Sequence, residues 1–241
     1  MSNAAVLEVK NLHKRFGGVH AVNDVSFQVK KGELLGLIGP NGSGKSTTVN
    51  LIAGTYTADS GDILFQGKSI LRNSIAQRAQ RGITRTFQTP RAFQGITVYN
   101  SIFTAALTKG SFEEADKKAM EILEMTGLMP LKDVFSEKLP IENRKWLDLA
   151  RILAIEPELI MLDEVMAGLN PSEMDESMAL IRRINESGIT IVFIEHVMRA
   201  VSALCQRVIV LSDGKMLCEG TPEYALNDPE VIKTYLGGKR G

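Results

Sequence analysis

The sequence predicts an α/β fold whose core is a mostly parallel sheet, with an N-terminal antiparallel β part and an inserted helical subdomain. Apolar runs typical of strands buried on both faces occur at Leu34–Ile38, Leu159–Leu162 and Ile189–Ile194. Apolar and polar residues alternate over Leu7–Val9 and Val25–Val29, as they do in half-buried strands. Residues 90–156 show helical patterns without a convincing strand, so we expect this stretch to be the insertion.

Helices and further strands are expected between these runs. The clearest helix spans Phe112–Thr126, where apolar residues recur at helical spacing and Gly127 is suited to end the helix. Pro140 is placed to start the next helix, which runs to about Ile155, before Pro157. The remaining helices are expected at Lys45–Ala53, Ser74–Arg81, Val98–Leu107, Ser172–Glu186 and Val197–Leu204, and the remaining strands at Asp62–Phe65, Val208–Leu211 and Lys215–Cys218.

Length and composition indicate one domain with a substantial core. The 241 residues are 44% apolar, and we expect a core of residues 1–89 and 157–241 with a helical subdomain of residues 90–156. The 28 basic and 28 acidic residues balance, so we expect no nucleic-acid partner. We expect neither a membrane span, which needs ~20 apolar residues, nor a secretory signal. Cys205 and Cys218 have no metal or redox spacing and are expected to be small buried hydrophobes.

A glycine-rich loop follows the first buried strand and leads into a helix. Its sequence, Gly39-Pro40-Asn41-Gly42-Ser43-Gly44-Lys45-Ser46-Thr47, matches the pattern G-x-x-x-x-G-K-[ST] of a P-loop NTPase core. Glycines let consecutive backbone N–H groups face one anion, and the helix N-terminus adds partial positive charge. We expect residues 41–47 to bind the phosphates of ATP, with Lys45 on the β- and γ-phosphates and Ser46 on Mg²⁺. The alternative, a glycine-rich turn with a chance Lys-Ser, leaves the flanking strand and helix unexplained.

An acidic pair, Asp163 and Glu164, follows the apolar strand Leu159–Leu162. In a phosphate-loop enzyme, an aspartate in this place holds Mg²⁺ directly or through water. Side chains alternate along a strand, so the two carboxylates need not share one task. Glu164 could accept a proton from the attacking water, or orient it. A strand that simply ends in solvent, where acids are common, is the alternative.

Further segments complete a pattern that covers nearly the whole chain. In order they are Phe16, the glycine loop, Gln88, Leu139–Leu147, Asp163-Glu164, Ala167–Asn170 and His196. Together they resemble the nucleotide-binding subunits of ABC transporters. The resemblance implies hydrolysis of ATP with Mg²⁺, a second ATPase subunit in a homodimer or heterodimer, and membrane-spanning permease subunits as partners.

The resemblance also implies roles for single residues. Phe16 would stack on adenine, with Val22 packing nearby. Gln88 would reach Mg²⁺ and the nucleophilic water, and would begin the loop that meets the membrane subunits. His196 would contact the γ-phosphate, and Ala167–Asn170 would cross the dimer interface. Without the resemblance, Phe16 could be a core aromatic, Gln88 a solvated side chain and His196 a structural residue.

Four segments narrow the group within this family. They are Phe16–Val19, Arg85–Gln88, Ala167–Pro171 and Asp228–Gly237, and they look like those of branched-chain amino acid importer ATPases. Lipopolysaccharide-exporter ATPases share part of this pattern. The resemblance implies a cytoplasmic subunit, peripheral on the inner face of the cell membrane. The transported solute and the direction of transport stay open, because the ATPase domain does not touch the solute.

One segment departs from the family pattern. The family signature reads close to Leu-Ser-Gly-Gly-Gln, and this chain has Leu139-Pro140-Ile141-Glu142-Asn143. In the family, the serine hydroxyl and the second glycine N–H contact the γ-phosphate held by the opposite subunit. Glu142 places a side chain and a negative charge there, a repulsion of about 1 kcal/mol at ~4 Å in water and about 4 at an effective dielectric of 20. We expect this segment to support hydrolysis poorly, although Arg144 and Lys145 could offset part of the charge.

Three other functions are alternatives. Glu142 keeps open a nucleotide-binding regulatory subunit with weak activity. A soluble ABC ATPase of DNA repair or translation usually carries two cassettes or a long coiled insertion, which this chain lacks. A small-molecule kinase would leave Gln88, Ala167–Asn170 and His196 unexplained.

Overall fold

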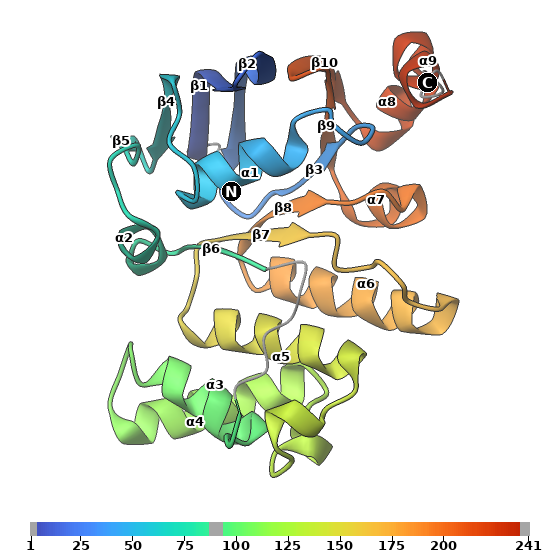
Figure 1. Cartoon of the computed structure of the whole chain (residues 1–241). Coiled ribbons are helices and arrows are strands. Elements are labelled where there is room, and N and C mark those ends of the chain that lie inside the picture. The colour runs from blue at the N-terminus through green and yellow to red at the C-terminus, as the bar shows by residue number, and fades with distance from the viewer. Residues whose placement is uncertain (1–3, 87–93, 237–241) are drawn as a thin grey trace.

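The protein contains two β-sheets, in a computed structural model that describes residues 4–86 and 94–236 (Figure 1). The first sheet is antiparallel, with strand order β2-β1-β4-β5. The second has the order β10-β9-β3-β8-β7-β6 and is parallel except for the β9–β10 pair. The strands are β1 (Ala5–Phe16), β2 (Val19–Lys30), β3 (Leu34–Ile38), β4 (Ser60–Phe65), β5 (Lys68–Ser69), β6 (Ile83–Arg85), β7 (Leu159–Asp163), β8 (Thr190–Ile194), β9 (Arg207–Ser212) and β10 (Lys215–Gly220). The predicted fold class is confirmed.

The predicted helices agree with the structure to within one residue at either end. The helices are α1 (Lys45–Ala53), α2 (Ile75–Gln80), α3 (Val98–Ala106), α4 (Phe112–Met125), α5 (Ile141–Ala154), α6 (Pro171–Glu186), α7 (Met198–Leu204), α8 (Pro222–Asn227) and α9 (Pro229–Leu236), with 3₁₀ turns at Met129–Leu131 and Ser136–Lys138. Helices α8 and α9 and strands β5 and β6 were not predicted. No helix in the described residues is long and apolar enough to cross a membrane.

The buried side chains form two clusters, one on each face of the six-stranded sheet. Leu35 and Leu37 of β3 belong to the cluster shared with α1 and the antiparallel sheet. Leu34 and Ile38 of the same strand belong to the cluster shared with the helices on the other face. Successive side chains of a strand point to opposite faces of the sheet. In a strand whose two faces are both covered, the odd-numbered and the even-numbered positions must therefore all be apolar. This explains why the parallel strands are continuous apolar runs.

Helices α3, α4 and α5 lie together on the side of the parallel sheet away from the antiparallel sheet (Figure 1). Their buried residues, such as Ile102, Leu123 and Leu153, join the cluster that also contains Ile160 and Phe193 of the sheet. The helical region therefore packs on the sheet through a shared core. Its boundary at residues 90–156 remains a prediction.

The sheet order places three functional segments side by side. Strand β8 lies between β3 and β7, and all three are parallel. Their carboxyl ends meet at one edge of the sheet, where ligands bind in open α/β folds. The glycine loop follows β3, Glu164 follows β7, and Glu195 and His196 follow β8.

Candidate functional site

The glycine loop turns the chain from β3 into α1 through backbone conformations that require glycine. Gly39 has φ +146° and Gly44 has φ +102°, and an added Cβ would lie 2.2 Å from the Leu211 carbonyl oxygen or 2.4 Å from that of Ala21. Gly44 is also the N-cap of α1, which has no side-chain cap and no acidic residue in its first turn. The first backbone N–H groups of α1 are therefore left to bind an anion.

The Lys45 side chain is buried against this loop. Its Nζ donates hydrogen bonds to the carbonyl oxygens of Gly39 (2.8 Å) and Pro40 (2.9 Å). Burial lowers the pKa of Lys45, and the nearby carboxylates of Glu164 and Asp163 oppose that shift. The ammonium is thus held at the loop and within electrostatic reach of the acidic pair.

The other loop residues differ in their access to solvent. Asn41, Gly42 and Ser46 are exposed, Gly44 and Thr47 are half-buried, and Ser43 is buried. The exposed Ser46 hydroxyl is open to a ligand or metal ion, as its predicted role requires. The predicted roles of these residues in binding phosphate remain predictions.

Contacts at both ends fix α1 in place. At the loop, the Gly214 N–H of the β9–β10 hairpin donates to the Ser43 carbonyl oxygen (3.1 Å). At the far end, Nη1 of the buried Arg78 donates to the carbonyl oxygens of Leu51 (2.6 Å) and Ile52 (2.7 Å). A cation there interacts favourably with the helix dipole and satisfies the last carbonyl groups. These contacts hold α1 between the β9–β10 hairpin and Arg78.

Asp163 ends β7 with a buried carboxylate. Its backbone N–H donates to Thr86 Oγ1 (3.0 Å), and its Oδ2 lies 3.4 Å from Nη2 of Arg85. Burial raises the pKa of Asp163, and the charge of Arg85 opposes that shift. Its Oδ1 is buried without a hydrogen-bond partner in the part of the chain that the structure describes. A carboxylate oxygen that protein groups leave unpaired, together with the Ser46 hydroxyl, fits the oxygen ligands that Mg²⁺ prefers.

Glu164 and His196 meet across the ends of β7 and β8. Glu164 Oε1 lies 2.9 Å from Nε2 of His196, and both side chains are about one-third exposed (30% and 37%). Glu164 has φ +51°, and its backbone N–H donates to the Ile194 carbonyl oxygen (2.9 Å). The turn after β7 thus leaves Glu164 accessible to water while Asp163 stays buried. The two carboxylates of the acidic pair have different surroundings, as separate tasks require.

Sequence analysis missed a third carboxylate at this edge, Glu195. Its side chain is 1% exposed; Oε1 accepts the Met166 N–H (2.7 Å) and Oε2 accepts the His196 N–H (3.2 Å). Burial raises the pKa of Glu195, and the two backbone hydrogen bonds oppose that shift. The sequence signal that could have identified Glu195 is its position directly after the buried strand β8. A carboxylate at such a position needs hydrogen-bond donors inside the protein.

The residues predicted to recognise adenine have different surroundings. The Phe16 ring is 45% exposed and makes an edge-to-face contact with Tyr56, with ring centroids 5.2 Å apart. The exposed ring is available for stacking. Val22 is fully buried in the core beside the antiparallel sheet, so contact with adenine would require its neighbours to move. Gln88 lies outside the described residues.

The signature segment forms the start of α5, with Pro140 as N-cap and no side-chain cap. Arg144 donates to the carbonyl oxygens of Leu139 (2.8 Å) and Glu137 (2.7 Å), and Lys145 donates to that of Ala167 (2.6 Å). Both cations that could offset Glu142 are therefore bonded to backbone oxygens. Lys145 also ties the start of α5 to the loop after the acidic pair. The Glu142 side chain lies outside the described part of the structure.

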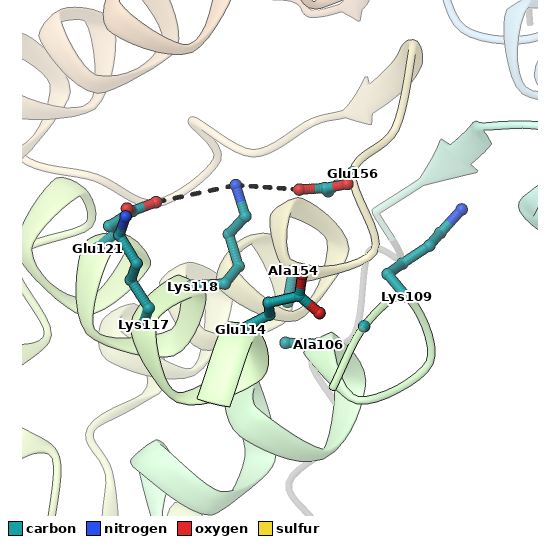
Figure 2. A pocket seen from close by; sticks show the side chains of 9 residues that line it. Ala106, Lys109, Glu114, Lys117, Lys118, Glu121, Ala154 and Glu156 are labelled. Atoms are coloured by element: carbon teal, nitrogen blue, oxygen red, sulfur yellow. Dashed lines mark ion pairs between the residues drawn. The ribbon is translucent and has the colours of Figure 1, made fainter. Parts of the chain in front are cut away.

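A separate hollow lies in the helical region, away from this edge (Figure 2). Lys118 reaches across it, with its Nζ 3.1 Å from Glu156 and 3.8 Å from Glu121. Glu114 accepts hydrogen bonds from Ser111 at the start of α4. Lys118 and the three glutamates are thus bonded to protein groups, and we assign the hollow no ligand.

The chain matches known proteins over nearly its full length. Residues 22–167 match the ABC transporter family. The chain is 36% identical to the high-affinity branched-chain amino acid transport ATP-binding protein BraF of Pseudomonas aeruginosa, over 96% of this chain and 98% of that protein. It is 33% identical to the lipopolysaccharide export system ATP-binding protein LptB of Escherichia coli, over 97% and 98%. Its fold is similar to the ADP conformation of MJ1267, an ATP-binding cassette of an ABC transporter, with a TM-score of 0.87 and 31% identity over 97% and 99% of the two chains.

Proposed function

The chain belongs to the ABC transporter family, and from this premise we propose that it binds and hydrolyses ATP to drive import of branched-chain or other hydrophobic amino acids. The observation that carries the ATPase part is the meeting of three features at one sheet edge. These are the glycine loop with Lys45, the Asp163 oxygen to which no described group donates, and the Glu164–His196 pair. The similarity to BraF supports the solute class, and the similarity to LptB makes lipopolysaccharide export the second candidate.

Each group has a role in the proposed reaction. The N–H groups at the start of α1 and the Lys45 ammonium bind the phosphates and stabilise the charge that develops during transfer. Glu164 accepts a proton from the attacking water, and His196 orients Glu164 and contacts the γ-phosphate. Mg²⁺ held by Ser46, Asp163 and Gln88 would neutralise phosphate charge. Phe16 offers its exposed ring to the adenine.

We infer that the chain works on the cytoplasmic face of the membrane, as one of two ATPase subunits bound to permease subunits. The test is purification of the tagged full chain from its native membrane in mild detergent, followed by reconstitution into liposomes. We expect permease subunits and a second ATPase chain to copurify, and ATP-driven uptake of labelled leucine. A complex that extracts lipopolysaccharide and takes up no amino acid would favour the second candidate. A chain that copurifies with no membrane protein would contradict the transport role.

We predict that Glu142→Gly raises the ATPase rate of the chain alone. Removing a carboxylate that repels the γ-phosphate by about 1 to 4 kcal/mol would speed the reaction by roughly 5-fold or more. The measurement is steady-state phosphate release from the purified wild type and variant at saturating ATP. Glu142→Gln is the matched control, because it removes the charge and keeps the bulk. Equal rates in all three proteins would remove the idea that Glu142 is inhibitory.

A further inference from the structure

We propose that Glu195 is a positioning residue that holds the turn carrying Glu164 in register with His196. The proposal rests on the ATPase function proposed above and adds a residue to its site. Glu195 does not touch the reacting atoms, because its carboxylate is 1% exposed and both its oxygens accept backbone N–H groups.

Glu195 makes one of the hydrogen bonds that join the turn after β7 to the end of β8 and the residues that follow it. The first link is the backbone hydrogen bond from Glu164 N–H to the Ile194 carbonyl oxygen (2.9 Å). The second joins Glu164 Oε1 to His196 Nε2 (2.9 Å). The third is the hydrogen bond that the Met166 N–H donates to Glu195 Oε1 (2.7 Å). Met166 lies two residues beyond Glu164 in the chain. The buried carboxylate therefore fixes the far side of the turn that displays Glu164.

This turn needs such support, because Glu164 has φ +51°, a conformation that L side chains rarely adopt. Strained backbone at an active site persists only where surrounding contacts over-determine it. Met166 is itself 1% exposed, so its buried N–H depends on the Glu195 oxygen as its hydrogen-bond acceptor. A shift of the turn would move Glu164, and a misplacement of about 1 Å can cost ~10²-fold in rate.

The chemistry of the site explains why this residue is a carboxylate. Two N–H donors from different segments must be satisfied inside the protein, and a glutamate provides two acceptor oxygens on one side chain. A glutamine retains one acceptor, and its amide group then faces the second N–H as a donor. Glutamine is therefore expected to keep one bond and lose the other, and alanine to lose both.

The experiment compares Glu195→Gln and Glu195→Ala with the wild type in single-turnover hydrolysis, with protein in excess over labelled ATP. We expect the rate to fall by roughly 10-fold in the first and 100-fold in the second, with ATP affinity within about 2-fold of wild type. The control is Thr190→Val at the opposite end of β8. It removes another buried side-chain acceptor, Thr190 Oγ1, from the Gly32 N–H (3.0 Å). We expect it to change thermal stability and leave the rate unchanged.

Two further measurements separate positioning from folding. In a Glu164→Gln background, Glu195→Gln should cause little additional loss, because residues that act through one another are not additive. The amide proton signals of Met166 and His196 should move in the NMR spectrum of Glu195→Gln. A wild-type rate in Glu195→Gln, or a loss that only parallels the fall in melting temperature, would overturn the proposal. A wild type that neither binds nor hydrolyses ATP would instead overturn the proposed function, and the amide signals would still test the positioning role.

Discussion

Glu164→Gln is expected to lower the rate of ATP hydrolysis by about 10²- to 10⁴-fold, the usual contribution of a general base. The amide cannot accept a proton from water. It can still pair with the His196 ring 2.9 Å away, since imidazole offers a donor or an acceptor according to its tautomer. The backbone of the turn and the glycine loop should therefore keep their geometry, and ATP affinity should stay near that of the wild type.

The measurements for Glu164→Gln are phosphate release in a single-turnover assay and equilibrium binding of a fluorescent ATP analogue. Glu121→Gln is a matched control, because it makes the same chemical change in an exposed carboxylate that forms a long ion pair with Lys118 (3.8 Å). Exposed pairs of this kind contribute little to stability. Unchanged hydrolysis in Glu164→Gln would refute the role given to Glu164. A parallel loss of binding would point to a role in holding the nucleotide.

The strands show what the sequence alone can predict about this fold. Strand β3 is found at Leu34–Ile38 as predicted, because a central strand covered on both faces must be apolar throughout. Strand β6 was missed, because it has three residues, Ile83–Arg85, and pairs with β7 alone among the described strands. Three residues are too few to show the alternation of apolar and polar side chains by which a strand is predicted. In this fold, the length of a strand therefore decides whether the sequence pattern reveals it more than its burial does.

The site was predictable where a local pattern carries the chemistry. Lys45 and Asp163 follow buried strands in motifs that can be read within ten residues. The contact between Glu164 and His196 joins positions 32 residues apart and depends on the parallel register in which Asp163 pairs with Ile194. Sequence spacing does not contain that register.

Glu195 was missed for a different reason. An acid beside a histidine is usually taken as a solvated neighbour, and only the three-dimensional structure shows that the carboxylate is buried on two backbone donors. The same holds for Lys145, whose bond to the Ala167 carbonyl oxygen joins α5 to the loop after β7. Supporting residues of this kind are fixed by tertiary contacts, so a local pattern can show that an acid follows a buried strand but not which groups it bonds.

Lys45→Ala is expected to weaken ATP binding by roughly 10- to 100-fold, which corresponds to the loss of charged hydrogen bonds worth about 1.5–3 kcal/mol. The Lys45 ammonium is already held at the loop by the Gly39 and Pro40 carbonyl oxygens, so little reorganisation precedes its contact with phosphate. Alanine removes that charge from a loop whose other binding groups are backbone N–H donors. The remaining donors should retain a weak affinity for ATP.

The measurement is the binding of labelled ATP to Lys45→Ala and to a control, Lys31→Ala, which removes an exposed lysine. The comparison distinguishes the loss of Lys45 at the glycine loop from the loss of one positive charge elsewhere. Melting temperatures of both variants identify any effect on folding, because Lys45 is buried. If Lys45→Ala folds and binds ATP undiminished, the glycine loop does not hold the phosphates. The metal ligands and the base would then have no substrate to act on, since each is defined by where the γ-phosphate lies.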